Sequence, residues 1–226
     1  MSGDRTDAVW TIVVAAGAGT RFGGPKQFLD LRGIRVVDRS IAVAARHSDG
    51  VVVVTPAEPV ADTGPIEAPR GAGLEDLGFE VVTGAASRTG SVRRGLAAVP
   101  SDAEIILVHD GARPLASDEI FVRVIDAVRA GAHAVTPAVP VADSLRRRDG
   151  GTIDRDEVIA VQTPQGFSAA ALRAAHRFAE EATDDVTVVE RDGGKVVVVN
   201  GDRRNLKLTT PLDLEIAGLF LDRGGL

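Results

Sequence analysis

The stretch from Val13 to Leu29, VVAAGAGTRFGGPKQFL, follows an apolar run that begins at Trp10 and predicts a strand ending in a ligand-binding loop. Small residues occupy positions 15 to 19, where they let backbone N–H groups approach a ligand closely. Arg21 and Lys26 add two cations to the same loop. The combination indicates the wall of a polyphosphate site. A tight strand-to-helix turn with two solvated charges is the alternative that this stretch alone leaves open.

Two better-known glycine loops do not fit this stretch. A dinucleotide-binding loop requires G-x-G-x-x-G, but Phe22 holds the third glycine position. A Walker A loop requires Gly-Lys-Ser/Thr, whereas Gln27 follows Lys26 here. The loop therefore matches neither of these two phosphate-binding patterns.

The bulk composition restricts the classes of protein that remain. A chain of 226 residues suits one domain, which we expect to span residues 1–226. The net charge of −6 argues against nucleic acid as a partner, and the absence of cysteine excludes disulfides and thiolate chemistry. No apolar run approaches the roughly 18 residues of a membrane span, so we expect no membrane association and a cytoplasmic location.

Valine-rich runs alternate with alanine-rich amphipathic stretches, a pattern typical of buried parallel strands covered by helices. We expect strands at 10–14, 50–55, 80–83, 105–108, 134–139 and 195–200. Helices are predicted at 37–45, 88–98, 117–130, 168–181 and 210–221, with a shorter one starting near 185. Residues 56–73 carry four prolines and predict an irregular surface excursion.

Two strand ends carry candidate ligand-binding residues. Asp110 follows the buried run IILV, and an acidic residue there is placed to hold a ribose hydroxyl or a magnesium–phosphate unit. Pairing with Arg113 is the alternative role for this carboxylate, and His109 is more typical of a structural histidine. Ala85 and Ser91 lie between a strand end and a helix start, where a nucleotide base can bind, or where a serine simply caps the helix.

Residues 140–160 depart from the alternation of strands and helices. An alternating run at 144–148 is followed by the turn Asp149-Gly150-Gly151 and a returning strand, which predicts a β-hairpin arm. Because an isolated two-stranded arm is marginally stable, we expect it to pack against something, most simply a second copy of the chain in a homodimer.

The order of short motifs resembles that of the sugar-alcohol-phosphate cytidylyltransferases, and in particular the 2-C-methyl-D-erythritol 4-phosphate cytidylyltransferase family. The first loop matches A-A-G-x-G-x-R followed by P-K-Q-F-L. SRTGSV, VHDGARP, PVADSL, VQTPQGF, ATDD and NLKLT then follow in the order of that family. Any one of these motifs is weak evidence, but together they cover nearly the whole chain.

The resemblance implies a three-layer α/β/α, Rossmann-like nucleotidyltransferase fold with a mostly parallel twisted sheet. It also implies that CTP and 2-C-methyl-D-erythritol 4-phosphate react to give 4-diphosphocytidyl-2-C-methyl-D-erythritol and pyrophosphate in the non-mevalonate isoprenoid pathway, with Mg²⁺ as cofactor. No nucleophilic side chain is required for this reaction.

The resemblance further assigns roles to individual residues. Arg21 and Lys26 would stabilise the transition state, and Arg155 and Lys207 would position the acceptor phosphate. Asp110 is also a candidate metal ligand. Cytidine would be held by Ala15, Ala16, Gly17, Gly19, Ala85, Ser91 and Asp110, and the acceptor hydroxyls by Asp143, Ser144 and Thr163.

Several departures from the family pattern bear on the substrate. The loop between Arg21 and Lys26 is about two residues shorter than usual. Ser144, Arg146 and Ala86 replace a common threonine, a common lysine and an occasional acidic residue. Two alternatives therefore stay open: ribitol 5-phosphate as the acceptor, and a catalytically inactive CTP-binding regulatory protein.

Overall fold

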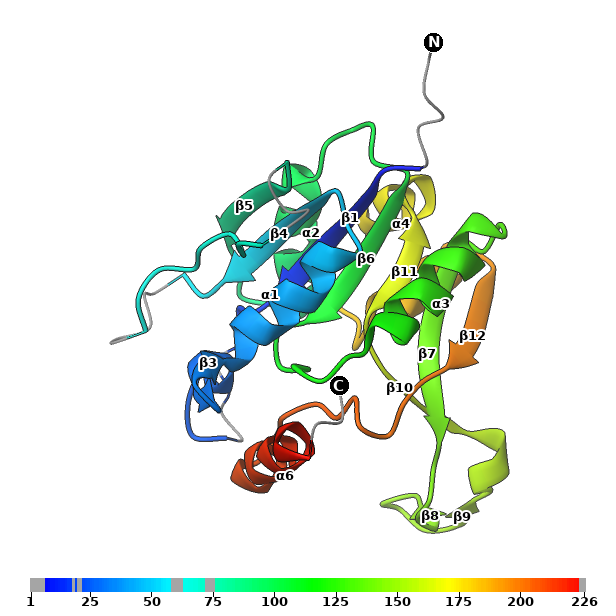
Figure 1. The fold of residues 1–226 in the computed structure, drawn as a ribbon. Helices are drawn as coiled ribbons and strands as arrows, with labels where there is room; N and C mark the ends of the chain where they lie inside the picture. The colour runs from blue at the N-terminus through cyan, green and yellow to red at the C-terminus, as the bar shows by residue number, and fades with distance from the viewer. Residues whose placement is uncertain (1–6, 18, 20–21, 58–62, 72–75, 224–226) are drawn as a thin grey trace.

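The computed structural model describes residues 7–17, 19, 22–57, 63–71 and 76–223, and its centre is a twisted sheet (Figure 1). The strands of this sheet follow the order β10-β7-β11-β6-β1-β4-β5, and β12 pairs with the other side of β7. Their bounds are Val9–Val14 (β1), Gly50–Thr55 (β4), Gly78–Thr83 (β5), Ile105–Asp110 (β6), Ala134–Pro140 (β7), Ile159–Val161 (β10), Gln165–Ser168 (β11) and Val196–Asn200 (β12).

Most strand pairs of this sheet are parallel, as the sequence predicts. β1 runs parallel to β4 and β6, and β5 runs parallel to β4. The exceptions are β10 and β11, which run antiparallel to β7, and β11 is also antiparallel to β6. The chain therefore moves outward from β1 through β4 to β5 and then crosses back to β6. This change of direction leaves the carboxyl ends of β1 and β6 side by side, with Val14 paired to Asp110.

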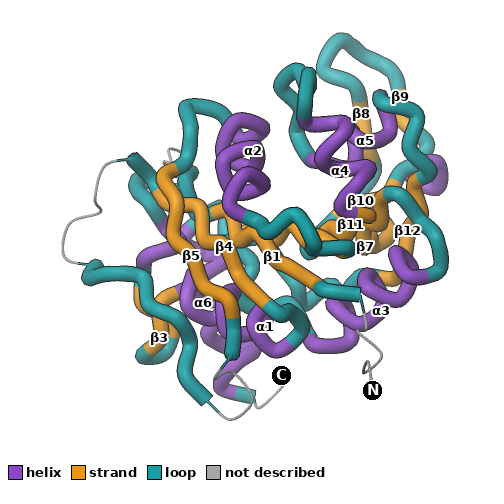
Figure 2. Tube along the Cα trace, turned by 90° about the horizontal axis from the view of Figure 1, so that it is seen from above, coloured by secondary structure: helices purple, strands orange, loops and turns teal. Residues whose placement is uncertain are grey.

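Helices cover both faces of the sheet, which confirms the predicted three-layer architecture (Figure 2). α1 and α3 lie on one face, and α2, α4 and α5 on the other. The helices are α1 (Val36–Arg46), α2 (Arg88–Ala98), α3 (Asp118–Arg129), α4 (Ala169–His176), α5 (Asp185–Arg191) and α6 (Pro211–Asp222). Short elements complete the chain: η1 (Lys26–Phe28), β2 (Asp30–Leu31), β3 (Ile34–Arg35), β8 (Leu145–Arg146), β9 (Thr152–Ile153) and η2 (Arg155–Glu157).

Alternation along the central strands produces the two hydrophobic cores. In β4, Val51 and Val53 pack with α1 and α3, whereas Val52 and Val54 pack with α2 and α4. Because successive side chains of a strand point to opposite faces, a continuous valine run fills both cores. A third, smaller core lies beneath α6 and contains Leu208 and Ala217. None of the helices in the described ranges is both long and apolar enough to cross a membrane.

The predicted helix at 168–181 is wrong at its C-terminal end, because α4 stops at His176. Arg93 of α2 donates to the carbonyl oxygens of His176 and Ala179, at 3.0 Å each. The Glu181 carboxylate also accepts a hydrogen bond from the backbone of Thr89 at 3.3 Å. These contacts draw the segment toward α2 instead of letting it continue as a helix. Another boundary also differs, since β5 begins at Gly78 and not at position 80.

The predicted β-hairpin arm is present and extends away from the sheet beyond β7 and β10 (Figure 1). β8 and β9 each contain two residues, fewer than the alternating sequence predicts. Gly150 and Gly151 form the turn with φ angles of 111° and 80°, which glycine adopts without steric cost. The strands of the arm are partly or fully exposed.

Phe121 is the side chain whose truncation we expect to destabilise the fold most clearly. It is fully buried and packs its ring against those of His47 and His109, with centroids 5.4 Å apart in each case. Phe121→Ala should lower the free energy of unfolding by about 3–5 kcal/mol, because it removes buried apolar surface and leaves a cavity. Urea unfolding followed by circular dichroism measures this loss.

Phe178→Ala is the matched control, because Phe178 is 91% exposed. Its free energy of unfolding should stay within about 0.5 kcal/mol of the parent chain. Equal losses in the two variants would contradict the assignment of Phe121 to the core.

Candidate active site

A cavity of about 500 Å³ opens at the carboxyl ends of β1 and β6. In an open α/β sheet this crevice, where the strand order reverses, is the place where ligands bind. The residues that line it come from the first loop, the start of α2, the end of β6 and the segment before α6. They are Val14, Ala15, Ala16, Gly17, Gly19, Lys26, Gln27, Ala85, Ala86, Ser87, Arg88, Ser91, Asp110, Ala112 and Lys207.

The first loop is shaped by Gln27 and Gly19. The Gln27 side chain is buried and donates to the carbonyl oxygens of Ala15 and Gly17, at 2.6 and 2.9 Å. Both carbonyls are thereby tied to the protein and do not compete for a cation or a ligand. Gly19 has a φ of 64°, and a Cβ there would collide with the carbonyl of Gly24. Lys26 begins η1 and lines the cavity, whereas Arg21 lies outside the described residues.

The opposite wall follows β5 and supports the prediction that helix capping occurs there. The Ser87 hydroxyl accepts a hydrogen bond from the backbone of Gly90 at 3.1 Å and caps α2. Ser91 accepts from the backbone N–H of Ala85 at 3.0 Å, and its hydroxyl lies 2.8 Å from the carbonyl oxygen of Ser87. Ser87 therefore caps the helix, which confirms one of the two interpretations. The segment also lines the cavity, and binding of a nucleotide base there stays a prediction.

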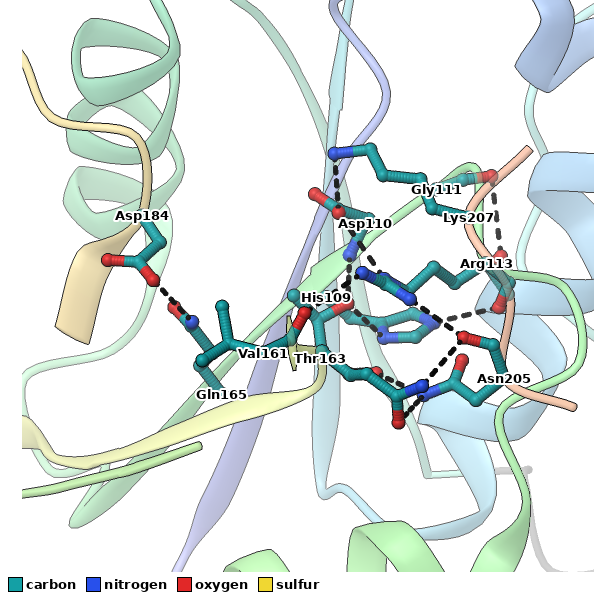
Figure 3. A network of polar contacts seen from close by, with 12 residues as sticks. His109, Asp110, Gly111, Arg113, Val161, Thr163, Gln165, Asp184, Asn205 and Lys207 are labelled. Carbon is teal, nitrogen blue, oxygen red and sulfur yellow. Dashed lines mark hydrogen bonds and ion pairs between the residues drawn. The ribbon is translucent and has the colours of Figure 1, made fainter. Parts of the chain in front are cut away.

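Asp110 and Lys207 form an ion pair at the mouth of β6 (Figure 3). The Lys207 ammonium lies 2.8 Å from Oδ2 of Asp110, and the Arg113 guanidinium lies 3.6 Å from the same oxygen. Burial opposes ionisation of this carboxyl. The positive charges of Lys207, Arg88 and Arg113 outweigh that effect and hold the pKa of Asp110 well below its usual range. Asp110 is therefore a carboxylate that keeps a lysine at a fixed place.

His109 and Thr163 form a buried hydrogen-bond network beneath this ion pair. Thr163 Oγ1 accepts a hydrogen bond from the backbone N–H of Asp110 at 3.0 Å and lies 3.1 Å from Nδ1 of His109. Nε2 of His109 lies 3.2 Å from the carbonyl oxygen of Arg113. Because a carbonyl only accepts, Nε2 carries the proton, and Nδ1 accepts from the Thr163 hydroxyl. His109 is thus structural, the role that its position in the sequence favours.

Asn205 holds the segment that carries Lys207. Its amide is fully buried and donates to the carbonyl oxygen of Thr163 at 2.9 Å. The Asn205 carbonyl oxygen accepts from the Arg113 guanidinium at 2.7 Å. Two residues later, the ammonium of Lys207 reaches Asp110 (Figure 3). The motif NLKLT therefore supplies an anchor and a cation together.

Most of the predicted site residues fall into two groups in this structure. The nine described candidates of the first group line the cavity: Ala15, Ala16, Gly17, Gly19, Lys26, Ala85, Ser91, Asp110 and Lys207. Asp143, Ser144 and Arg155 belong to the arm and are exposed, and they are not among the described residues that line the cavity. The Arg155 side chain donates to the carbonyl oxygen of Ala142 at 2.9 Å.

Thr163 makes its contacts inside the protein and not at the cavity surface. It is 4% exposed and uses its hydroxyl inside the protein, so the structure gives it a supporting role beneath Asp110. Its predicted contact with the acceptor stays a prediction. Two cavity residues, Arg88 and Gln27, received no role from the sequence. Both lie inside recognised motifs, SRTGSV and PKQFL, so these motifs were the sequence feature from which a role for them could have been predicted.

The donor groups of the cavity allow a magnesium ion that is shared with a ligand. Asp110 is the acidic residue among the described lining residues, and one of its carboxylate oxygens already binds Lys207. No cluster of three metal-ligating residues is present within the described ranges. Mg²⁺ is commonly held by one or two carboxylates together with substrate phosphates. The residues therefore fit a metal that arrives with a nucleotide, and Asp110 would hold it.

Comparison with known proteins decides the family. The model of the family described as IspD: 2-C-methyl-D-erythritol 4-phosphate cytidylyltransferase matches residues 9–223. The chain belongs to this family. The match extends over the cavity, the arm and the segment that carries Lys207, so it covers every element that forms or approaches the site.

Individual relatives agree with this assignment. The 2-C-methyl-D-erythritol 4-phosphate cytidylyltransferase of Nocardia farcinica is 43% identical, and the aligned region covers 97% of this chain and 96% of the relative. The bifunctional enzyme IspD/IspF of Clavibacter michiganensis is 41% identical over 95% of this chain, which spans 55% of that relative's length. The solved structure of the cytidylyltransferase from Thermus thermophilus is 32% identical and has a TM-score of 0.78, and the match covers 96% of this chain and 98% of that one.

Membership of the IspD family confirms the predicted class, a nucleotidyltransferase with an α/β fold. It also favours the main interpretation of the sequence, a cytidylyltransferase of isoprenoid biosynthesis, over the ribitol 5-phosphate and inactive alternatives.

The buried histidine beneath the site predicts a specific pH dependence of stability. Burial lowers the pKa of His109 to about 4, so the folded protein excludes a proton that the unfolded chain binds below pH 6.5. Between pH 6.5 and 4 the free energy of unfolding should therefore fall as the pH falls, by about 3 kcal/mol in total for this one group. Urea unfolding at half-unit pH steps measures the slope.

His109→Gln should flatten the stability profile between pH 6.5 and 4, because glutamine binds no proton there. The exposed His133 provides the control, and His133→Asn should keep the slope of the parent chain. A parent-like slope in His109→Gln would show that His109 is not the group responsible.

Proposed function

We propose that this chain transfers the cytidylyl group of CTP to 2-C-methyl-D-erythritol 4-phosphate. A phosphate oxygen of the acceptor forms a bond to the α-phosphorus of CTP, and the bond from that phosphorus to the bridging oxygen breaks. The products are 4-diphosphocytidyl-2-C-methyl-D-erythritol and pyrophosphate. One observation carries the proposal: in a member of this family, the glycine loop, Lys26, Asp110 and Lys207 meet in one cavity.

The chemistry asks the protein to bring two anions together and to stabilise charge on the phosphate oxygens. Lys26 and Lys207 come to the cavity from opposite ends of the sequence, and Asp110 keeps Lys207 in place. We infer that Lys26, with Arg21, stabilises the transition state and that Lys207 positions the acceptor phosphate. A fixed cation costs no reorganisation during reaction, so it stabilises the transition state efficiently.

The nucleoside end of CTP fits the other wall of the cavity. We propose that the loop at Ala15, Ala16, Gly17 and Gly19, together with Ala85 and Ser91, holds cytidine, and that Asp110 holds the ribose or the metal. Magnesium supplies Lewis-acid neutralisation of the phosphate charges when it is bound. Asp110 and the CTP phosphates would hold it.

The arm provides the acceptor-binding residues that this cavity does not contain. Asp143, Ser144 and Arg155 are exposed here, and the β10 side chains Ile159 and Val161 are 49% and 42% exposed. A two-stranded arm has little stability alone, so a covering surface is expected. We propose a homodimer in which the arm of one copy supplies these residues to its partner's cavity.

The acceptor assay tests the proposed function. Pyrophosphate release from CTP and Mg²⁺ should occur with 2-C-methyl-D-erythritol 4-phosphate and be at least tenfold slower with ribitol 5-phosphate at the same concentration. Release with ribitol 5-phosphate alone would establish the alternative acceptor. CTP binding without release from either acceptor would favour the regulatory protein.

Mixed dimers test the shared site. Arg155→Ala and Lys26→Ala chains should each be nearly inactive, because each lacks one required cation in both sites. When the two are mixed and re-associated, one site of each mixed dimer regains both residues, so activity should recover toward a quarter of the parent value. A verified mixed dimer with no recovered pyrophosphate release would contradict the exchange of the arm.

A further inference from the structure

A buried network of three polar side chains, Arg88, Asp185 and His176, lies behind the wall of the cavity formed by α2. Arg88 lines the cavity, and its Nη1 lies 2.7 Å from Oδ2 of Asp185. The other oxygen of Asp185 lies 3.1 Å from Nε2 of His176. Asp185 is fully buried and His176 is 2% exposed. This network therefore extends from the cavity into the protein interior between the helices.

Three helices and the sheet hold this network in place. Arg88 is the first residue of α2, His176 is the last residue of α4, and Asp185 is the first residue of α5. The backbone N–H of Asp185 donates to the side chain of Gln165 in β11, which also donates to Asp184 at 3.1 Å (Figure 3). Asp185 is thus anchored on the sheet, while Arg88 extends from it to the cavity.

The geometry also indicates which residue of the network carries the positive charge that balances the Asp185 carboxylate. A carboxylate only accepts, so Nε2 of His176 carries a proton. Nδ1 of His176 is buried without a hydrogen-bond partner among the described residues, and a proton there would leave an unpaired donor. The arrangement therefore suits a neutral histidine, and Arg88 is the cation that balances Asp185.

Stability alone gives no reason for a charge pair at this place. Replacement of a buried ion pair by apolar side chains is often neutral or stabilising. The Arg88 side chain, however, is 23% exposed at the cavity, and the charge of Asp110 acts on it across the site. A guanidinium fixed from behind and open toward an anion-binding cavity is a preorganised cation.

We propose that Asp185 and His176 are positioning residues that hold Arg88 in place as a cation of the nucleotide site. The inference rests on the proposed function, because it takes CTP as the anion in this cavity. It assigns a role in substrate binding to two buried residues that do not line the cavity.

The test is the dissociation constant of CTP with Mg²⁺, measured by isothermal titration calorimetry, together with KM and kcat. Arg88→Ala should weaken CTP binding by about 10- to 100-fold, the range expected for loss of a charge-assisted contact. Asp185→Asn should weaken it by roughly tenfold, because Arg88 loses its fixed partner. His176→Leu should have a smaller effect, and His176→Gln, which keeps a donor near Nε2, should restore binding to within about threefold of the parent.

The double variant distinguishes positioning from general damage. If Asp185 acts through Arg88, the double variant Arg88→Ala and Asp185→Asn should bind CTP no more weakly than Arg88→Ala alone. Fully additive losses would overturn the proposal. Arg93→Ala is the matched control, because Arg93 also joins α2 to His176, through the carbonyl oxygen at 3.0 Å, without lining the cavity. A loss of CTP binding in Arg93→Ala equal to that in Asp185→Asn would likewise overturn it.

The outcomes separate this inference from the proposed function. Parent chain that binds CTP but releases no pyrophosphate contradicts the proposed function, while the comparison of dissociation constants still decides the role of Asp185. Parent chain that turns over normally, with unchanged CTP binding in Asp185→Asn, contradicts the inference alone. Parent chain that binds no CTP overturns both. Circular dichroism of each variant verifies that it is folded.

Discussion

The ion pair between Lys207 and Asp110 joins the last part of the chain to the switch point of the sheet. Asp110 ends β6 beside the end of β1, so its position depends on the pairing of those two strands. Lys207 depends on Asn205 and Arg113, which fix its segment against the residues that follow β10. The site therefore requires the central sheet and the C-terminal segment to be folded together.

Local charge gives an acidic protein a cavity that is suited to a polyanion. The chain carries a net charge of −6, yet Lys26, Arg88 and Lys207 all line one cavity. Asp110 introduces a negative charge among them. Its low pKa keeps it ionised, so its carboxylate orients Lys207. We infer that this carboxylate serves to position the cations of the cavity, although its negative charge also repels a phosphate.

Much of this could be predicted from the sequence, because the patterns are local. The apolar runs of β4 and β6, the glycine loop and the turn at Gly150 each depend on neighbouring residues alone. The motifs also identified nine of the residues that line the cavity, from Ala15 to Lys207, but gave no role to Gln27 or Arg88. The C-terminal end of α4 could not be predicted, since contacts from Arg93 and Thr89 decide it. The buried partner of Arg88, Asp185, is 97 positions away in the sequence, and no spacing rule joins them.

The turnover number of Lys207→Ala tests the central claim most directly, with Lys195→Ala as the matched lysine control and circular dichroism to verify folding. With saturating CTP, Mg²⁺ and acceptor, we predict a loss on the order of 10²–10³ in kcat for Lys207→Ala, as for removal of a preorganised charge. Lys195 is exposed and immediately precedes β12, away from the cavity, so its variant should keep the parent rate. A folded Lys207→Ala chain with the kcat of the control would show that the cation held by Asp110 takes no part in the reaction.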